Sequence, residues 1–514
     1  MSRAARIMEP LIAVIGATGT GKSKLAVDLA TRFNGEIING DAMQMYRGLP
    51  IITNQIPINE RNGIPHHLLS CRGFDQPPWR IGRFKAECLK AIEQVRQKGK
   101  LPILVGGTHY YTQSVLFHEP LLDEGAESEQ EGEVYENDGS GSSPSRSSEK
   151  FAILDASPEA MLQKLREVDP VMANRWHPNE TRKIRRSLEI YLQTGRRASE
   201  IYEDQKAQIK QSMTKSGEGA DSSPAGSNIE PSPAQSGQLR FPTIMFWTNT
   251  ETETLKERLV GRVDDMAHQG LIREAQTLFQ YLNEQESQGV KKIDRTKGVW
   301  VAIGFKELEP YFRVLSSGTS DAEHLKDVEE RCLESVKSST KQYAKQQLKW
   351  IRGKLWNALL TANATDKLYL VDTTNPQQWS SDVLQPAERV VEAFLADKPC
   401  PDPKSLSAMA NEIFGTKMSS TPRDRSAELK CIQCEVCNRT LLGEEQYIAH
   451  IHSYGHKRKL KSIKKREEKE RYRAAAEEER EKKTDDGDGD NNKKPTAADT
   501  TETTSANTTA TPTT

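Results

Sequence analysis

Eight residues near the start of the chain have the types and spacing that bind a chain of phosphates. Residues 16–23 read GATGTGKS and match G-x-x-x-x-G-K-S/T, between an apolar run and a segment with helical periodicity. The glycines let successive backbone N–H groups face phosphate oxygens, and a helix start adds positive potential. Lys22 supplies a point charge, and the Ser23 hydroxyl is placed to bind a phosphate-bound Mg²⁺. ATPases and kinases use this loop, and it equally suits a pyrophosphate leaving group. The predicted phosphate-binding residues are Gly16, Ala17, Thr18, Gly19, Thr20, Gly21, Lys22 and Ser23.

An acid follows the second predicted strand. Residues 36–41 read EIINGD, so Asp41 lies where the strand ends. Ligand sites of parallel sheets lie beyond the carboxyl ends of the strands, which brings Asp41 close to the phosphate loop. Three roles fit this position: a general base, a metal ligand, or a cap for the following segment.

Cysteines and histidines crowd together far along the chain, in a pattern typical of a zinc site. Two residues separate Cys434 from Cys437, twelve separate Cys437 from His450, and five separate His450 from His456. Two ligands on a hairpin and two on a helix would enclose Zn²⁺ tetrahedrally. Cys431 pairs equally well with Cys434 by spacing, and His452 with His456, so the spacing alone leaves the choice open.

Composition limits the class of protein to which these residues belong. The 514 residues correspond to about three domains at roughly 150 residues each. Hydrophobic residues make up 35% and the mean hydropathy is −0.71, so polar tracts dilute ordinary cores. Lys and Arg number 72 against 73 Asp and Glu, so any nucleic-acid-binding surface must be local. Apolar runs are shorter than the ~18–20 residues of a membrane span, and no signal-peptide core follows Met1. The cysteines outside the cluster are scattered, which indicates a reducing compartment.

The order of strand and helix patterns predicts the fold class. Apolar runs at Leu11–Ile15, Glu36–Asp41 and Leu101–Val105 alternate with helical segments such as Lys22–Phe33, which indicates a parallel sheet. Further helices are expected at Pro158–Val168, Asn179–Thr194, Glu251–His268 and within 325–356, with strands at Phe241–Trp247 and Leu368–Val371. Gly125–Lys150 and Lys210–Gly237 are polar tracts that cannot order themselves.

The predicted organisation is therefore an α/β core interrupted by an insertion. We expect a P-loop NTPase-like parallel sheet flanked by helices, a helical insertion and a small C-terminal zinc finger. The predicted parts are core 1–118, insertion 119–240, core 241–395, Pro/Ser-rich linker 396–428, finger 429–460, and a basic, then disordered tail 461–514.

The motifs, taken in order, resemble those of the tRNA dimethylallyltransferases, also called tRNA isopentenyltransferases. The likeness covers roughly residues 10–375, and the form with a C-terminal zinc finger is the eukaryotic one. That finger favours Cys434, Cys437, His450 and His456 as the Zn²⁺ ligands. The likeness is carried by GATGTGKS (16–23), DAMQMY (41–46), IPHHL (64–68), GGTHYY (106–111), RKIRRSLE (182–189), GRVDDM (261–266), GVW (298–300), IGFKE (303–307) and KQYAK (341–345).

The resemblance implies a reaction. A dimethylallyl group passes from dimethylallyl diphosphate to N6 of the adenosine 3′ of the anticodon, and diphosphate is released. Asp41 then takes the amine proton, while the phosphate loop, Lys22 and a Ser23-bound Mg²⁺ stabilise the diphosphate. Thr18 and Arg262 join Asp41 as catalytic residues by the same resemblance. Ala42 stands where relatives commonly have Ser, so a hydroxyl beside Asp41 is missing. The implied tRNA contacts in this region are Asp41, Ala42, Met43, Gln44 and Thr108.

Two basic segments are candidates for holding RNA. In Asn179–Thr194 the apolar residues recur at helical spacing and leave Arg182, Lys183, Arg185 and Arg186 for other faces. The resemblance places this segment in the insertion that grips the anticodon stem-loop, with the target base drawn from its stack. Lys457–Arg473 has ten basic and three acidic residues, and it fits an RNA-backbone contact, a nuclear address or a solvated helix. We expect finger and basic run to add tRNA affinity without touching the chemistry.

Other readings of the motifs stay open. A P-loop kinase of a nucleotide or small metabolite, a prenyltransferase acting on free adenylate, and a non-catalytic RNA-binding protein are the alternatives to the tRNA enzyme. Monomer is the default expectation, with no membrane partner. Arg3 and Arg6 precede the first acid, and Met8 offers a second start. We therefore expect a cytoplasmic protein with mitochondrial and nuclear pools.

Overall fold

Two compact units make up the described part of the chain. The computed structural model describes residues 9–118, 151–204, 207, 237–289, 293–318, 321–418, 420–421 and 430–485. Described residues of Met1–Lys150 and Thr194–Asp424 form the first unit, and those of Phe151–Gln193 and Arg425–Thr514 form the second. Among these residues, every helix is too short or too polar to cross a bilayer.

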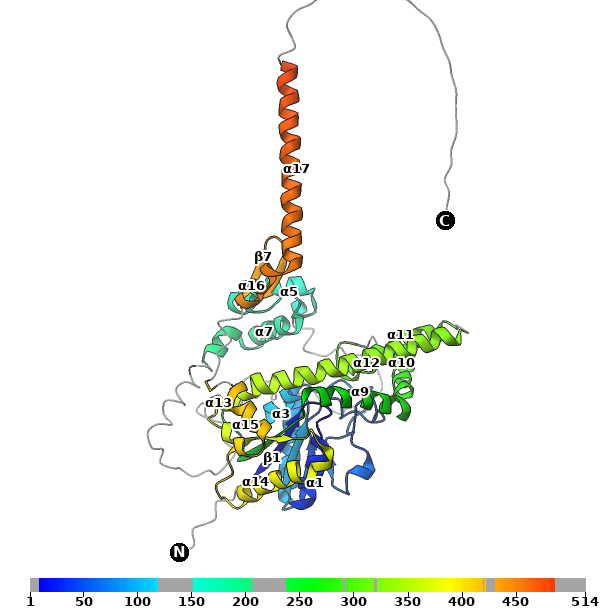
Figure 1. Ribbon diagram of the computed structural model, residues 1–514, viewed down its shortest axis with the longest axis vertical. Coiled ribbons are helices and arrows are strands. Elements are labelled where there is room, and N and C mark those ends of the chain that lie inside the picture. The colour runs from blue at the N-terminus through cyan, green and yellow to red at the C-terminus, as the bar shows by residue number, and fades with distance from the viewer. Residues whose placement is uncertain are drawn as a thin grey trace, which may run out of the picture. The chain divides into compact units, whose positions relative to one another are not determined.

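A six-stranded sheet forms the centre of the first unit (Figure 1). Its strands run β3-β2-β4-β1-β5-β6, and each neighbouring pair is parallel. Because helices cover both faces of such a sheet, its strands are apolar throughout, and all six residues of β1 are buried. The strands are β1 (Leu11–Gly16), β2 (Gly35–Asn39), β3 (His66–His67), β4 (Leu101–Gly106), β5 (Thr243–Asn249) and β6 (Leu368–Asp372).

Alternate residues of the strands build two cores, one on each face. Ile12 and Val14 of β1 face a core shared with α1 (Lys22–Arg32) and α14 (Gln385–Leu395). Ala13 and Ile15 face the opposite core, which includes residues of α2, α3, α13 and α15. These helices span Ile81–Gln97, His109–Leu116, Trp356–Thr361 and Ala408–Glu412. The sheet is thereby fixed between two helical layers, and its carboxyl edge is held in register.

A helical group beside the sheet closes one side of the phosphate loop. It consists of α9 (Thr252–Gln269), α10 (Leu271–Ser287), α11 (Phe305–Ser316) and α12 (Ala322–Trp350). Leu255 and Leu259 of α9 and Ala344 of α12 pack around Ala17. Figure 1 shows α9 and α12 passing close to the sheet, which lets side chains from late in the sequence reach a loop near its start.

The second unit combines a helical segment with a hairpin and two further helices. The helical segment holds α5 (Pro158–Val168), α6 (Pro170–Arg175) and α7 (Thr181–Thr194). The hairpin pairs β7 (Cys431–Cys434) with β8 (Arg439–Leu442), followed by α16 (Glu444–His452) and the long α17 (Tyr454–Asp485). His177, between α6 and α7, lies 3.1 Å through Nε2 from the Thr440 carbonyl oxygen. This hydrogen bond ties the helical segment to the hairpin.

The structure confirms the predicted fold class, but some strands begin or end at other residues than predicted. The second strand ends at Asn39, two residues before Asp41, and β5 covers Thr243–Asn249 rather than Phe241–Trp247. The predicted linker 396–428 is partly folded, because Ala410, Ile413 and Phe414 are buried in the first unit's core. Apart from Gly237, the two predicted polar tracts lie outside the described residues, as does the tail beyond Asp485. The other predicted part boundaries stay predictions.

A candidate site at the carboxyl edge of the sheet

The phosphate loop joins β1 to α1 in the conformation that its glycines permit. Gly19 has φ +84°, and a Cβ there would lie 2.9 Å from Leu259 Cδ2, so a larger residue would clash with α9. Lys22 Nζ donates to the Ala17 carbonyl oxygen at 2.7 Å, which folds the lysine back over the loop. Burial lowers the pKa of Lys22 to about 8, while the Asp41 carboxylate opposes that shift. Lys22 is therefore a buried cation in need of an anionic partner.

Arg262 reaches this loop from α9. Its Nη1 donates to Thr18 Oγ1 at 2.7 Å. Burial lowers the pKa of Arg262 to about 10, so the guanidinium stays charged at neutral pH. Its Nε is buried and has no hydrogen-bond partner among the described residues. The structure thus brings together Thr18, Lys22 and Arg262, with donors left over for an anion.

Asp41 lies just beyond the end of β2, held by the turn that follows. Its Oδ1 accepts hydrogen bonds from the Met43 backbone N–H at 3.1 Å and from Thr108 Oγ1 at 3.3 Å. The Asn39 side chain spans the same turn, accepting from the Asp41 N–H and donating to its carbonyl oxygen, each at 3.0 Å. The contact with Met43 is the capping role anticipated for this residue, and it leaves Asp41 Oδ2 for other contacts.

Electrostatics couple Asp41 to the phosphate loop. Burial raises the pKa of Asp41, whereas the Met43 N–H and the Lys22 ammonium act in the opposite direction. Gly107, after β4, comes so close that a Cβ there would lie 3.3 Å from Asp41 Oδ2. A carboxylate with a raised pKa is a better proton acceptor, so this geometry suits the general base among the three roles proposed for Asp41.

The remaining residues expected to contact tRNA near Asp41 occupy the loop after β2 and the start of α3. The Ala42 N–H donates to Thr108 Oγ1 at 3.2 Å, so Thr108 bridges Ala42 and Asp41. Thr108 therefore provides Asp41 with a hydroxyl donor although Ala42 has none. Gln44 Nε2 donates to the Asn54 carbonyl oxygen at 2.8 Å. Met43 is partly exposed and packs beside the core of the α9–α12 group.

Two residues of α12 complete the site, and no role was predicted for them. Gln347 Oε1 accepts from the Thr18 N–H at 2.8 Å, and its Nε2 donates to the Gly107 carbonyl oxygen at 2.9 Å. Tyr343, one turn earlier, lies within hydrogen-bonding reach of Thr108 and Gln347, and burial raises its pKa. The spacing of Tyr343 and Gln347 places them on one helix face, but nothing in the sequence says what that face meets.

His66 and His67 have structural partners. His67 Nε2 lies 2.7 Å from Glu36 Oε2, and His66 Nδ1 lies 2.8 Å from the Ile64 carbonyl oxygen. Lys98 and Lys100 also pair with Glu36, and with His67 they hold the pKa of that buried carboxyl at about 2 although burial alone would raise it. This cluster ties β3 to the sheet.

The basic residues predicted on α7 lie on its exposed side. Ile184 and Leu188 are fully buried, as their spacing predicted. Lys183 pairs with Glu180, and Arg186 pairs with Glu189 at 3.1 Å. Arg185 Nη1 donates to the Leu154 carbonyl oxygen at 2.9 Å, while Arg182 is exposed. These side chains can reach phosphates only by exchanging partners that they already have.

The predicted metal ligands come together in the second unit. The ligand atoms of Cys434, Cys437, His450 and His456 all lie within 4.8 Å of one another. His456 Nδ1 lies 3.5 Å from each of the two sulfurs and 3.2 Å from His450 Nε2. Cys431 and His452 are not part of this group. His450 and His456 belong to α16 and α17, so the histidines come from two helices rather than the single helix predicted.

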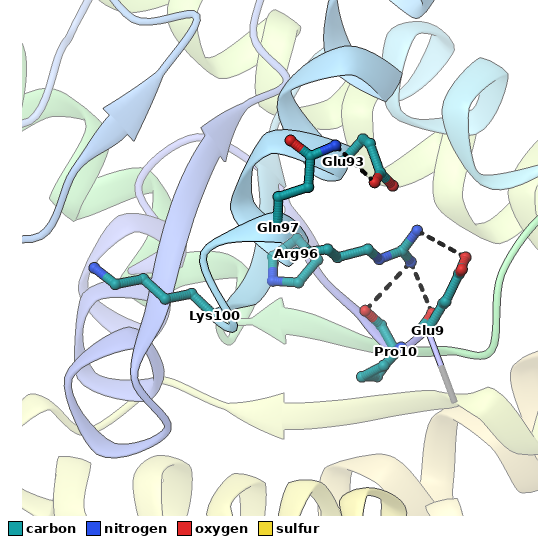
Figure 2. Close-up of a pocket in the computed structure, with 7 residues that line it drawn as sticks. Glu9, Pro10, Glu93, Arg96, Gln97 and Lys100 are labelled. Carbon is teal, nitrogen blue, oxygen red and sulfur yellow. Dashed lines mark hydrogen bonds and ion pairs between the residues drawn. The ribbon is translucent and has the colours of Figure 1, made fainter. Parts of the chain in front are cut away.

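A separate pocket lies at the opposite edge of the sheet. It has a volume of about 300 Å³ and is lined by residues that precede β1 and β4, among them Pro10 and Lys100. Arg96 crosses it and pairs with Glu9 Oε2 at 3.2 Å, as Figure 2 shows. Both cations that line it already have carboxylate partners, Arg96 with Glu9 and Lys100 with Glu36. This pocket therefore offers no unpaired charge for a phosphate, and the carboxyl edge is the candidate site.

A phosphate loop with a carboxylate beside it, at the carboxyl edge of a parallel sheet, defines a P-loop α/β protein. The family model described as IPP transferase matches residues 44–354. A tRNA dimethylallyltransferase of Schizosaccharomyces pombe is 36% identical, covering 90% of this chain and 97% of the relative. That of Saccharomyces cerevisiae is 32% identical, covering 88% and 92%. The chain belongs to the IPP transferase family.

A solved structure agrees with this assignment over nearly the whole chain. The crystal structure of a eukaryotic dimethylallyltransferase acting on tRNA matches with a TM-score of 0.68 at 31% identity. The match covers 90% of this chain and 99% of the other. The family resemblance and the fold class predicted from the sequence are therefore confirmed.

Proposed function

We propose that this chain transfers a dimethylallyl group from dimethylallyl diphosphate to N6 of the adenosine 3′ of the anticodon in tRNA. Membership of the IPP transferase family favours this activity over a kinase, an adenylate prenyltransferase or a silent RNA-binding protein. The observation that carries the proposal is the position of Asp41. Its carboxylate lies at the same sheet edge as the phosphate loop and within the electrostatic reach of Lys22.

Different residues of the site serve the two chemical events, removal of the amine proton and departure of the diphosphate. The adenine amine attacks the first carbon of the dimethylallyl group, the carbon–oxygen bond breaks, and its electron pair leaves with the diphosphate. Asp41 accepts the proton that the amine loses, since its raised pKa makes it a stronger base than an exposed carboxylate. Lys22, Arg262 and the loop N–H groups stabilise the charge that develops on the diphosphate. Thr18 connects Arg262 to the loop.

Two metal ions fit the residues present. Ser23 lies in the first turn of α1, directly after Lys22, where a hydroxyl binds a phosphate-bound Mg²⁺. Mg²⁺ there would add positive charge to the leaving diphosphate. Cys434, Cys437, His450 and His456 form a two-sulfur, two-nitrogen set that suits Zn²⁺. Because α17 begins two residues before His456, zinc would fix the start of this helix.

Binding of tRNA is assigned to three groups of residues. Gln44 and Thr108 lie beside Asp41, where the extracted adenosine must enter. Arg182, Lys183, Arg185 and Arg186 lie on α7, and the basic run Lys457–Arg473 lies on α17. From Lys457 to Arg466 that helix carries seven basic residues and no acid, and all seven are exposed. Such a helix suits the phosphate backbone of the anticodon stem.

The proposal is tested with purified protein, Mg²⁺, dimethylallyl diphosphate and a tRNA that has an unmodified adenosine 3′ of the anticodon. Mass spectrometry of the nucleosides should show one added five-carbon group on that adenosine and one diphosphate released per transfer. Free AMP and ATP serve as alternative acceptors and should stay unmodified. Consumption of ATP without any prenylated nucleoside would instead establish a kinase or ATPase.

Localisation is proposed as cytoplasmic with mitochondrial and nuclear pools. The support comes from the sequence: Arg3 and Arg6 lie ahead of Met8, and a basic run follows His456. Fluorescent fusions that begin at Met1 and at Met8 should differ in their mitochondrial fraction. Identical distributions would remove the role of the two arginines.

A further inference from the structure

The backbone N–H groups of the phosphate loop are not equivalent. Those of residues 19–23 have no acceptor among the described residues, so they are available to phosphate oxygens. The Thr18 N–H differs, because it already donates to Gln347 Oε1 at 2.8 Å. The loop therefore has five consecutive backbone N–H groups that can donate to a ligand, and the Thr18 N–H before them cannot.

Gln347 is held so that it cannot easily release this donor. It is 4% exposed, and its Nε2 donates to the Gly107 carbonyl oxygen at 2.9 Å. A Cβ at Gly107 would lie 2.4 Å from that nitrogen, so only glycine admits the contact. On the other side, Arg262 donates to the Thr18 hydroxyl at 2.7 Å. The Thr18 N–H is thus occupied by Gln347, while the hydroxyl is held by Arg262 through one of its lone pairs.

We propose that Gln347 determines donor specificity by closing the Thr18 end of the loop, so that a diphosphate fits and a triphosphate does not. In loops of this pattern the backbone N–H groups hold the inner phosphates and the lysine reaches the outer one, and here Lys22 is folded back to Ala17, next to Thr18. An outer phosphate would have to take the Thr18 N–H from Gln347. The buried Oε1 would then lose its hydrogen bond with the Thr18 N–H, which is costly in the interior. This inference rests on the proposed function, because it concerns the same loop.

The test measures binding of inorganic pyrophosphate and inorganic tripolyphosphate, each with Mg²⁺, to the full chain by calorimetry. The measured quantity is the ratio of the two dissociation constants. Gln347→Ala removes the hydrogen bonds to Thr18 and Gly107 and the contact with Tyr343, and it opens space. It should shift this ratio toward tripolyphosphate by about tenfold. Gln347→Met frees the Thr18 N–H with little loss of volume and should shift it in the same direction. Gln346→Ala, on the exposed side of α12, is the matched control and should leave the ratio unchanged.

The outcomes separate this inference from the proposed function. If both Gln347 variants bind pyrophosphate with the wild-type preference over tripolyphosphate, Gln347 does not set the limit of the loop, and the transferase proposal stands. If the wild type fails to bind pyrophosphate, both proposals fall. Melting temperatures show whether the variants are folded, and should Gln347→Ala unfold, Gln347→Met decides by the same ratio.

Discussion

The phosphate-loop site and the Cys/His cluster are built in opposite ways. At the phosphate loop, partners come from distant parts of the chain: the Thr18 N–H meets Gln347, and the Thr18 hydroxyl meets Arg262. At the cluster, all four ligands lie within 23 consecutive residues, from Cys434 to His456. A packed sheet holds the first site in place, whereas a metal bound by the four side chains would itself hold the small hairpin and the two helix ends together. Damage to the two sites should therefore have different consequences.

Removal of the Asp41 carboxylate should have the largest effect on chemistry. Asp41→Ala is expected to lower the rate of prenyl transfer by about 10²–10⁴-fold, because the amine proton loses its acceptor. The dissociation constant for tRNA should change little, since the sheet that shapes the site stays intact. Single-turnover assays with saturating tRNA and donor measure the first quantity, and filter binding measures the second.

Asp265→Asn is the matched control for this variant. Asp265 is an exposed acid of α9, in the same motif as Arg262, and its replacement should leave the rate unchanged. If Asp41→Ala transfers the dimethylallyl group at the wild-type rate, Asp41 is only a cap for its turn.

Loss of a cysteine ligand should release the metal and spare the chemistry. Cys434→Ser is expected to abolish the one bound zinc per chain, raise KM for tRNA roughly 3- to 10-fold through lost phosphate contacts, and leave kcat nearly unchanged. Cys431→Ser tests the alternative ligand on the same strand, and it should retain the zinc. Metal analysis by mass spectrometry provides the count. Zinc lost from Cys431→Ser but kept by Cys437→Ser would reverse the assignment.

The two sites also differ in how far the sequence could predict them. Local patterns identified the loop, Asp41 and β1, because uninterrupted apolar runs followed by polar residues reflect buried strands directly. Gln347 stayed unassigned because its partners lie 329 and 240 residues away, and only the packing of α12 brings them together. For the cluster, spacing supplied the candidates but left Cys431 and Cys437 equal as the partner of Cys434. The hairpin register decided, by placing Cys434 at the turn with Cys437.

The burial that organises the phosphate loop also predicts its pH dependence. Lys22 in the free protein has a pKa of about 8, so it is charged below that pH and increasingly neutral above it. Pyrophosphate affinity should therefore fall by up to about tenfold per pH unit above 8 as this cation is lost. Lys22→Arg keeps its charge, so the ratio of wild-type to variant affinity isolates the lysine from the ligand's own titration. A ratio that stays constant from pH 7 to 10 would show that Lys22 does not titrate there.

On the acidic side, transfer requires ionised Asp41. Burial raises the pKa of Asp41, so kcat should begin to fall at a higher pH than an ordinary carboxyl group would give. The opposing Lys22 charge limits this rise, and neutralising it with Lys22→Met should move the acidic limb further up. If the pH at which kcat falls is the same in Lys22→Met as in the wild type, the charges of Lys22 and Asp41 are not coupled.

The smallest effect is expected on α7, where the basic side chains already have partners. Arg186 pairs with Glu189 at 3.1 Å, so an RNA phosphate must compete with that carboxylate. Arg186→Ala should raise KM for tRNA a few-fold and reduce the slope of log Kd against log salt by about 0.7–0.9, the value of one phosphate contact. Glu189→Gln releases the arginine and should change KM in the opposite direction.

Because exposed ion pairs contribute little to stability, both variants should keep the wild-type melting temperature within a few degrees. If KM for tRNA rises in Arg186→Ala and falls in Glu189→Gln, Arg186 contacts a phosphate. If both variants keep the wild-type KM, Arg186 is a solvated surface charge.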